Sequence, residues 1–264
     1  MKKKVLIILV AIPVLYLLTG VYLCFNIDRI AFVPTTMDRD EPYSFDFTFT
    51  ERYIKINEKD SVSIMHAKTP IESKGLVLFF HGNSSDLRNW GKMSPQFHRN
   101  GYDVVMVDYP GFGKSSGKHT EQGLYDTADK LYQWAKQEYD NKDMVILGRS
   151  IGSVPASYLS SKRKVKRVIL ETPLSNMGLV IKKRFPIAPV CKKLYRRFAV
   201  DHWLGQSKNE VHIIRSEKDR LILGTSNEGI VPLAESHFMV EGAEHGNLGS
   251  FDSYQKKLSE LLVN

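Results

Sequence analysis

The stretch that decides the fold is Met144-Val145-Ile146-Leu147-Gly148-Arg149-Ser150-Ile151-Gly152, in which four apolar residues run into a glycine-flanked serine. A short apolar run is typical of a buried strand, and the glycines predict a tight turn into a helix. The pattern G-x-S-x-G holds its serine on a strained turn, because the glycines at 148 and 152 let strand and helix approach closely. Ser150 is therefore a candidate nucleophile. The same pentapeptide also occurs in ordinary loops, so this interpretation depends on the rest of the chain.

Two further strands are predicted upstream of the serine, and each ends in a polar, glycine-containing turn. Gly75–Phe80 runs into His81-Gly82-Asn83-Ser84, and Tyr102–Tyr109 runs into Pro110–Gly117. With these elements in this order, the chain resembles the α/β-hydrolase superfamily over roughly residues 45 to 264. It is most similar to the serine aminopeptidase-like branch, which includes membrane-anchored esterases and acyl-protein thioesterases.

The resemblance implies a catalytic triad in the chain order serine, acid, histidine. Asp219 follows the predicted strand Val211–Ser216, with Glu217 as the alternative acid, and His245 follows the predicted strand His237–Val240. A hydroxyl is a poor nucleophile unless an imidazole removes its proton, and a carboxylate must hold that imidazole in the right tautomer. We therefore expect Asp219 and His245 to act on Ser150.

The resemblance also implies an oxyanion hole made of two backbone amides, which would be those of Ile151 and Asn83. Two features depart from the family pattern. Glu244 precedes the histidine where glycine is common, and Leu221-Ile222-Leu223-Gly224 comes soon after the acid where a proline is common. These departures bear on the geometry of the histidine and acid loops.

Other polar residues in the same segments are assigned structural roles. We expect His81 to shape its turn rather than transfer a proton, and Asp108 to brace its own loop, because the family acid follows the serine. No Cys/His cluster has metal-ligand spacing and no glycine-rich phosphate loop is present, so no metal or cofactor is expected. With only Cys24 and Cys191, no disulfide framework is predicted.

The predicted fold class is α/β. Two early antiparallel strands (45–57 and 61–68) precede alternating strands and helices, including a helix from Glu121 to Tyr139 capped by Thr120 and a final helix from Ser250 to Leu262. This alternation predicts a mostly parallel central sheet with helices on both faces. Residues 29–264 are predicted to form one α/β-hydrolase domain, with a small cap insertion at about 174–204.

The N-terminal segment predicts a membrane anchor over residues 1–28. After Lys2-Lys3-Lys4, the uncharged run Val5–Phe25 is long enough as a helix to cross about 30 Å of hydrocarbon. A cleaved signal peptide is the competing reading, but the run is longer than a usual signal core and lacks a small-x-small cleavage site. The lysine and arginine bias places the N-terminus in the cytoplasm and the hydrolase domain on the extracytoplasmic side.

Positive charge is concentrated in the second half of the chain, and the net charge is +8. Two readings of the basic cap are open: a solvated basic face, or a surface that rests on anionic lipid headgroups. The lipid reading uses basic residues interleaved with apolar ones, namely Lys182, Lys183, Arg184, the run Lys192–Arg197, Phe185, Ile187, Leu194, Tyr195 and Phe198. Nothing else in the chain resembles a nucleic-acid-binding fold, so no nucleic acid is expected.

These observations predict a membrane-anchored serine hydrolase that cleaves carboxylic ester or thioester bonds of a small-molecule or acylated substrate through an acyl-enzyme. The alternatives are a serine peptidase, because the resembled branch includes peptidases, and a non-catalytic membrane-associated binding module with a hydrolase fold. An acidic residue placed to recognise a substrate amino terminus would favour the peptidase.

Overall fold

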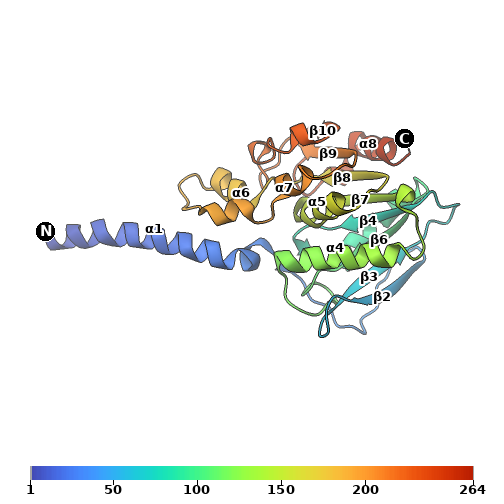
Figure 1. Cartoon of the computed structure of the whole chain (residues 1–264), viewed down its shortest axis with the longest axis horizontal. Helices are drawn as coiled ribbons and strands as arrows, with labels where there is room; N and C mark the ends of the chain where they lie inside the picture. The colour runs from blue at the N-terminus through green and yellow to red at the C-terminus, as the bar shows by residue number, and fades with distance from the viewer. Residues whose placement is uncertain (1, 264) are drawn as a thin grey trace.

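An eight-stranded sheet forms the centre of the computed structural model, which describes residues 2–263 (Figure 1). The strand order is β10-β9-β8-β7-β4-β6-β3-β2; β3 is antiparallel to both of its neighbours, and the remaining pairs are parallel. The predicted α/β class with a mostly parallel sheet is confirmed. The strands are β2 (Phe49–Lys55), β3 (Ser61–Ala67), β4 (Leu76–Phe80), β6 (Asp103–Val107), β7 (Met144–Arg149), β8 (Arg167–Glu171), β9 (Val211–Ser216) and β10 (Ser236–Val240).

Helices cover both faces of the sheet, and the central strands are apolar on both sides for that reason. Along β4, Leu76, Leu78 and Phe80 pack into the core cluster that contains α4 (Glu121–Ala135) and α5 (Ser153–Lys162). The alternate residues Val77 and Phe79 pack into the opposite cluster. That second cluster contains α8 (Asp252–Val263) and Phe97 of α3 (Ser94–His98), and the short α2 (Leu87–Trp90) precedes α3.

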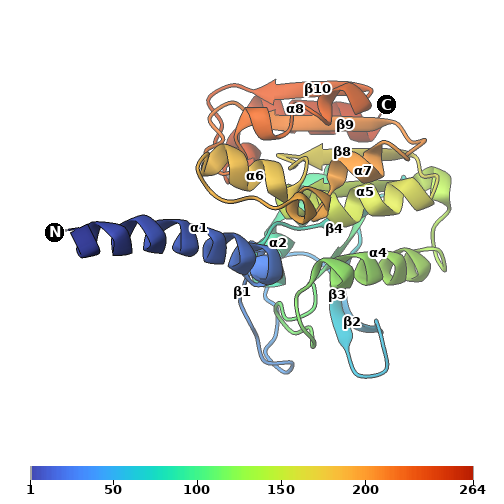
Figure 2. The same cartoon turned by 60° about the vertical axis from the view of Figure 1, so that its left-hand side comes forward.

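The cap lies between β8 and β9, where the insertion is predicted. It consists of α6 (Met177–Arg184), a 3₁₀ turn (Lys192–Arg196) and α7 (Val200–Leu204). Figures 1 and 2 show α6 on the side of the domain from which the N-terminal helix α1 departs.

Three residues assigned to a lipid-facing cap surface lie elsewhere, and that part of the prediction was wrong. Leu194 and Phe198 are fully buried in the core. Arg197 forms ion pairs with Asp28 of α1 and Glu121 of α4. These side chains attach the cap to the domain, whereas Phe185, Ile187 and Tyr195 are exposed as expected.

The helix α1 (Lys2–Ala31) is long and apolar enough to cross a membrane, and most of its length is exposed (Figure 1). It continues past the predicted boundary at residue 28 into the domain. Gly20, Cys24, Ile27 and Ala31 recur at three- and four-residue spacing and are buried on one helix face. The last turns of α1 are therefore part of the hydrolase core.

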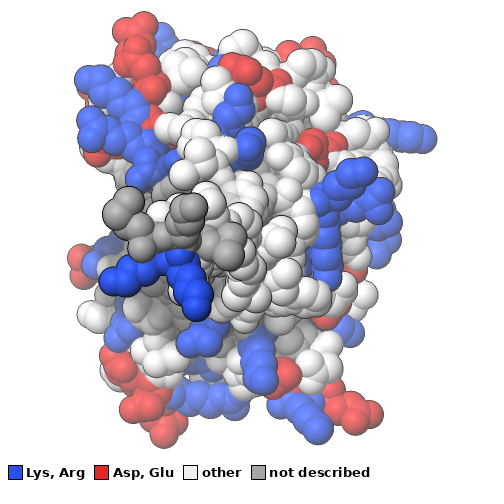
Figure 3. All heavy atoms as spheres, turned by 90° about the vertical axis from the view of Figure 1, so that its left-hand side faces the viewer, with Lys and Arg blue, Asp and Glu red and all other residues white. Residues whose placement is uncertain are grey.

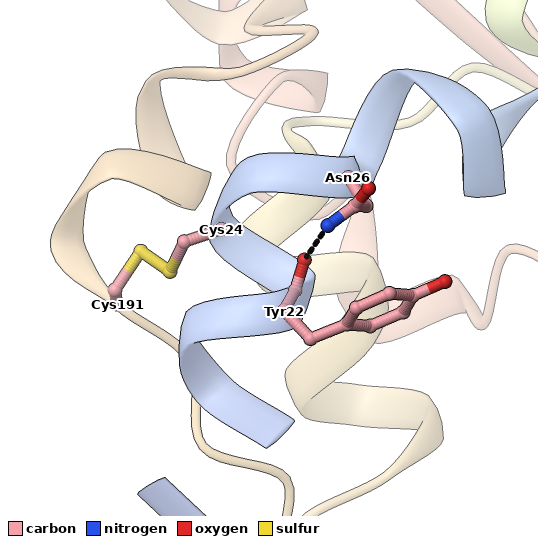
Figure 4. Close-up of a disulfide and its surroundings, with 4 residues drawn as sticks. All are labelled: Tyr22, Cys24, Asn26 and Cys191. Atoms are coloured by element: carbon pink, nitrogen blue, oxygen red, sulfur yellow. Dashed lines mark hydrogen bonds between the residues drawn. A yellow bond between two sulfur atoms is a disulfide. The ribbon is translucent and has the colours of Figure 1, made fainter. Parts of the chain in front are cut away.

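A disulfide joins Cys24 of α1 to Cys191 of the cap (Figure 4). The sequence-based expectation of no disulfide was wrong, because the fold brings together two segments that are 167 residues apart. Close packing accompanies the bond: a Cβ atom built on Gly20 would lie 3.0 Å from Cβ of Pro189 in the cap. The cap is thus held against α1 by both a covalent bond and side-chain packing.

Candidate active site

Ser150 occupies a strained turn directly after β7. Its φ of +54° lies in the left-handed region, which L-residues other than Asn and Asp rarely adopt. A Cβ at Gly148 would collide with the carbonyl oxygen of Gly152, and a Cβ at Gly152 would collide with that of Phe80. Close backbone contacts therefore exclude a side chain at Gly148 and at Gly152, as the motif predicts.

The three predicted triad residues are brought together from the ends of separate strands. His245 Nε2 lies 2.9 Å from Ser150 Oγ, and His245 Nδ1 lies 2.7 Å from Asp219 Oδ2. Ser150 and the Asp219 side chain are almost fully buried, and the histidine side chain is 19% exposed. With Nδ1 protonated toward the carboxylate, Nε2 is free to accept the serine proton.

The acid and histidine loops accommodate both departures from the family pattern. Asp219 Oδ1 accepts hydrogen bonds from the backbone amides of Leu221 (2.9 Å) and Ile222 (2.8 Å), which fixes the carboxylate without a proline. The Glu244 side chain points into solvent, while its amide donates to Asn247 Oδ1. The alternative acid, Glu217, is exposed and accepts from the amide of Gly242 instead of contacting the histidine.

The two predicted oxyanion residues flank Ser150. Ile151 lies in a 3₁₀ turn (Ser150–Gly152), and the first amides of such a turn have no partner within it. Asn83 lines the space beside Ser150 and is held by the last residue of α1 and the segment that follows it. Its side chain donates to the carbonyl of Ala31 (3.1 Å), and its own carbonyl accepts from Val33 (2.8 Å). Two short strands, β1 (Val33–Pro34) and β5 (Ser84–Ser85), pair next to this contact.

Two buried side chains, His81 and Asp108, lie next to the loop that carries Asn83, with His81 Nε2 3.8 Å from Asp108 Oδ1. His81 is fully buried, and its Nδ1 lies 2.7 Å from the carbonyl oxygen of Gly82. Burial lowers the pKa of His81 to about 4. Burial and the neighbouring Asp86 raise the pKa of Asp108 to about 8, and Asp108 accepts from the Leu87 amide. These contacts are structural, as the sequence indicates for both residues.

Sequence reasoning missed a buried network behind the histidine loop. Arg149 donates to the carbonyls of His245 (3.3 Å) and Gly246 (3.1 Å), and its guanidinium lies 3.8 Å from Glu171. Tyr254 of α8 donates to the same Glu171 carboxylate (2.6 Å). Burial raises the pKa of Glu171, and the charge of Arg149 opposes that rise. Arg149 is therefore a positioning residue for the histidine loop.

Two cavities of unlike character meet at Ser150, and both are also lined by Asn83. The first, called here the polar cavity, measures about 640 Å³. It lies between α2, α3 and the histidine loop, and its charged lining residues are all basic: Lys92, Arg99 and Arg149. None of the described residues that line it is acidic.

The second, called here the apolar cavity, measures about 680 Å³ and lies between α1 and the cap. One wall is a stripe of α1 that includes Tyr16, Thr19, Leu23 and Ile27. The facing wall comes from α6 and the segment after it, including Met177, Val180, Ile181, Phe185 and Ile187. Within the described residues, no group of three or more His, Cys, Asp or Glu side chains is placed to hold a metal ion.

The comparisons with known proteins agree with this architecture. A family described as alpha/beta hydrolase fold matches residues 75–201. Human alpha/beta hydrolase domain-containing protein 17C is 28% identical over 209 residues, which cover 75% of this chain and 61% of the relative. Human protein 17B is 26% identical over 219 residues, covering 79% and 73% of the two chains. The chain thus spans about three fifths of the length of the 17C relatives that it matches.

Solved structures show the same fold at low sequence identity. The Pyrococcus furiosus esterase Pf2001 superimposes with a TM-score of 0.69 at 18% identity, covering 87% of this chain and 98% of the esterase. The alpha/beta hydrolase GrgF from Penicillium superimposes with a TM-score of 0.66 at 10% identity, covering 82% and 98%. At these identities the likeness concerns the fold alone.

Proposed function

Because this chain belongs to the α/β-hydrolase superfamily, we propose that it is a membrane-anchored serine hydrolase that cleaves carboxylic ester or thioester bonds. The observation that carries the proposal is the chain of contacts from Asp219 through His245 to Ser150, with both hydrogen bonds shorter than 3 Å. This arrangement is the one that converts a serine hydroxyl into a nucleophile. It supports catalysis over a binding module that has lost turnover.

The proposed reaction proceeds in two halves. In the first, Ser150 Oγ attacks the substrate carbonyl carbon while His245 Nε2 takes its proton, and Asp219 stabilises the resulting imidazolium. The carbonyl oxygen becomes an oxyanion held by the amides of Ile151 and Asn83. His245 then protonates the leaving alcohol or thiol, which departs and leaves an acyl-serine. In the second half, water repeats the attack and releases the acid.

The lining of the polar cavity favours an ester or thioester over a peptide amino terminus. An aminopeptidase would need an acidic residue beside the nucleophile to pair with the substrate ammonium group. The charged residues placed there are cationic, namely Lys92, Arg99 and Arg149. An ammonium group would be repelled, whereas a neutral or anionic leaving group would be accepted.

Two observations support an anchored domain on the extracytoplasmic side. α1 carries an apolar run, Val5–Phe25, of the length that spans hydrocarbon, and most of the described side chains in this run are exposed. The disulfide between Cys24 and Cys191 favours an oxidising compartment, because cytosolic thiols are kept reduced. The helix supports the anchor, and the disulfide agrees with the orientation inferred from the distribution of lysine and arginine.

The test is hydrolysis of a series of acyl esters and thioesters by the full-length protein in detergent micelles. We expect turnover by the native protein and a fall in kcat of at least about 10³-fold for Ser150→Ala. Ser157→Ala is the matched control, because this serine lies on α5 and its hydroxyl bonds only to the Val154 carbonyl. Turnover that survives in Ser150→Ala, or no turnover by the native protein, would contradict the proposal.

A further inference from the structure

The two main walls of the apolar cavity come from α1 and the cap, which both lie outside the central sheet. On α1, the lining residues Tyr16, Thr19, Leu23 and Ile27 follow one another at three- and four-residue spacing, so they form a stripe on one helix face. On α6, Met177, Val180 and Ile181 share the same kind of spacing. The disulfide between α1 and the cap holds the two walls together (Figure 4).

The outer end of this cavity lies beside the exposed apolar part of α1. Tyr16 is nine residues before Phe25, which places it about 13 Å along the helix inside the predicted membrane run. Phe185 and Ile187 of the facing wall are 60% and 86% exposed. Large apolar side chains with that exposure at the same end as an unpaired apolar helix indicate a surface that contacts lipid rather than water.

Basic side chains surround this end of the molecule. Lys182, Lys183, Lys192 and Lys193 are exposed on the cap, and the Lys193 ammonium lies 5.4 Å from the ring centre of Phe25. Figure 3, which views the molecule from the α1 side, shows white, uncharged atoms over much of this face, with lysine and arginine to their left and right and acidic groups among them. This pattern fits an apolar opening that lies in hydrocarbon while the surrounding cations reach the headgroups.

We propose that the apolar cavity is a channel for the acyl chain of a long-chain ester or thioester that is still seated in the bilayer. The chain enters sideways between α1 and α6, and the carbonyl reaches Ser150 at the inner end. The leaving group then occupies the polar cavity on the water side. This inference rests on the proposed function and extends it, because it names the substrate class and assigns α1 a part in binding in addition to anchoring.

The dimensions fit this occupant. The lining residues of α1 extend from Tyr16 to Ala31, a rise of about 22 Å, and the volume of about 680 Å³ lies within the range of sites that enclose an extended ligand. A longer acyl chain partitions more strongly from water into the bilayer, where the channel opens. For an ester added from water, hydrolysis is therefore expected to increase with chain length until the chain fills the channel.

The test uses the full-length protein in phosphatidylcholine vesicles with two probes, the butanoyl and hexadecanoyl esters of umbelliferone. Leu23→Trp narrows the channel from α1, and Val180→Trp narrows it from the cap. We expect the ratio of hexadecanoyl to butanoyl kcat/KM to fall at least about tenfold in each variant, because the indole obstructs the long chain but not the short one, and overpacking of about 1.4 kcal/mol is enough for that change. Leu17→Trp is the matched control, because Leu17 is 65% exposed and is not among the residues that line the cavity.

The outcomes separate the two proposals. If the narrowed variants hydrolyse both esters with the native ratio, the channel is wrong and the serine hydrolase proposal stands. If the native protein hydrolyses neither ester, both proposals are wrong. Because the two narrowing changes come from opposite walls, one variant that folds poorly leaves the other to decide, and butanoyl hydrolysis reports an intact triad.

The direction of entry has its own measurement. The native protein is reconstituted either in vesicles that contain a diacyl phospholipid with a fluorogenic ester, or in lipid vesicles that are then mixed with substrate vesicles. Sideways entry predicts hydrolysis in the first case and at least about a tenfold lower rate in the second, because diacyl lipids leave a bilayer slowly. Equal rates would show that the acyl chain arrives through water and would overturn sideways entry.

Discussion

The polar and apolar cavities share Ser150 and Asn83 but have different origins. The polar cavity is built by loops that follow the strands of the sheet, together with α2 and α3. The apolar cavity is built mainly from α1 and the cap, which lie outside the sheet, and its inner end is closed by residues of the loops after β4, β7 and β9. Under the proposed function, the triad and the leaving-group site thus belong to the sheet and its loops, whereas the acyl site belongs mainly to α1 and the cap.

The largest expected effect concerns the predicted triad, whose residues lie on loops at the ends of the sheet strands. Asp219→Asn should lower kcat by about 10³ to 10⁴-fold, because an amide favours the wrong tautomer of His245. Glu217→Gln should change kcat by less than about threefold, since Glu217 is exposed and bonded to the Gly242 amide. Steady-state hydrolysis of a short-chain ester measures both. An equal loss in the two variants would mean that the acid has been misassigned.

The next effect concerns the support of the polar cavity. Arg149→Met leaves Glu171 buried without its cation, and we expect a loss of about 3 to 5 kcal/mol in the free energy of unfolding. The loss of the two donors to the histidine loop should also lower kcat. Denaturant titration and short-ester kinetics measure the two effects.

The pH dependence of this variant has a defined sign. Burial raises the pKa of Glu171 in the native protein, and removal of Arg149 raises it further. A carboxyl whose folded pKa is raised stabilises the fold below its unfolded pKa of about 4.3, and that contribution is lost as pH rises toward the folded value. The destabilisation should therefore be larger at high pH than at low pH. The double variant Arg149→Met, Glu171→Gln should lose this pH dependence while kcat stays low.

The smallest effect concerns the disulfide that joins the two walls of the apolar cavity. Replacement of Cys24 and Cys191 by serine opens a long covalent loop, and we expect a loss of about 2 to 4 kcal/mol in stability. Short-ester hydrolysis should change little, because neither cysteine is among the residues that line the polar cavity. Thermal unfolding with and without reductant, followed by the long-to-short ester ratio, measures this difference. If short-ester hydrolysis falls as much as long-ester hydrolysis, the two cavities are not independent.

Much of the fold could be predicted because its signals are local. Apolar runs gave the positions of β4, β6, β7 and β9 within one or two residues, and Thr120 caps α4 as expected. α4 ends at Ala135 rather than at Tyr139. The Tyr139 hydroxyl instead bonds to Asp103 at the start of β6 (2.7 Å), a contact across the fold that has no local signal.

The candidate site likewise contains residues that local sequence signals predict and residues that they do not. The elbow and the order of acid and histidine could be predicted, since each follows a recognisable strand. The pair of Arg149 and Glu171 could not, although the two residues are direct neighbours in the register of β7 and β8. To find this pair, one must know the strand order, which no single segment specifies. The bond between Cys24 and Cys191 could not be predicted either, because it depends on how α1 packs against the cap.

The way α1 enters the core has a consequence for where this protein can work. An enzyme on a loose linker searches a volume around its attachment point. Here α1 kinks at Asn26 and then continues into buried positions at Ile27 and Ala31, and Arg197 holds it to the domain through Asp28. If α1 spans a bilayer, Ser150 is therefore fixed at one depth, and the thickness of the surrounding membrane decides which carbonyl groups lie level with it.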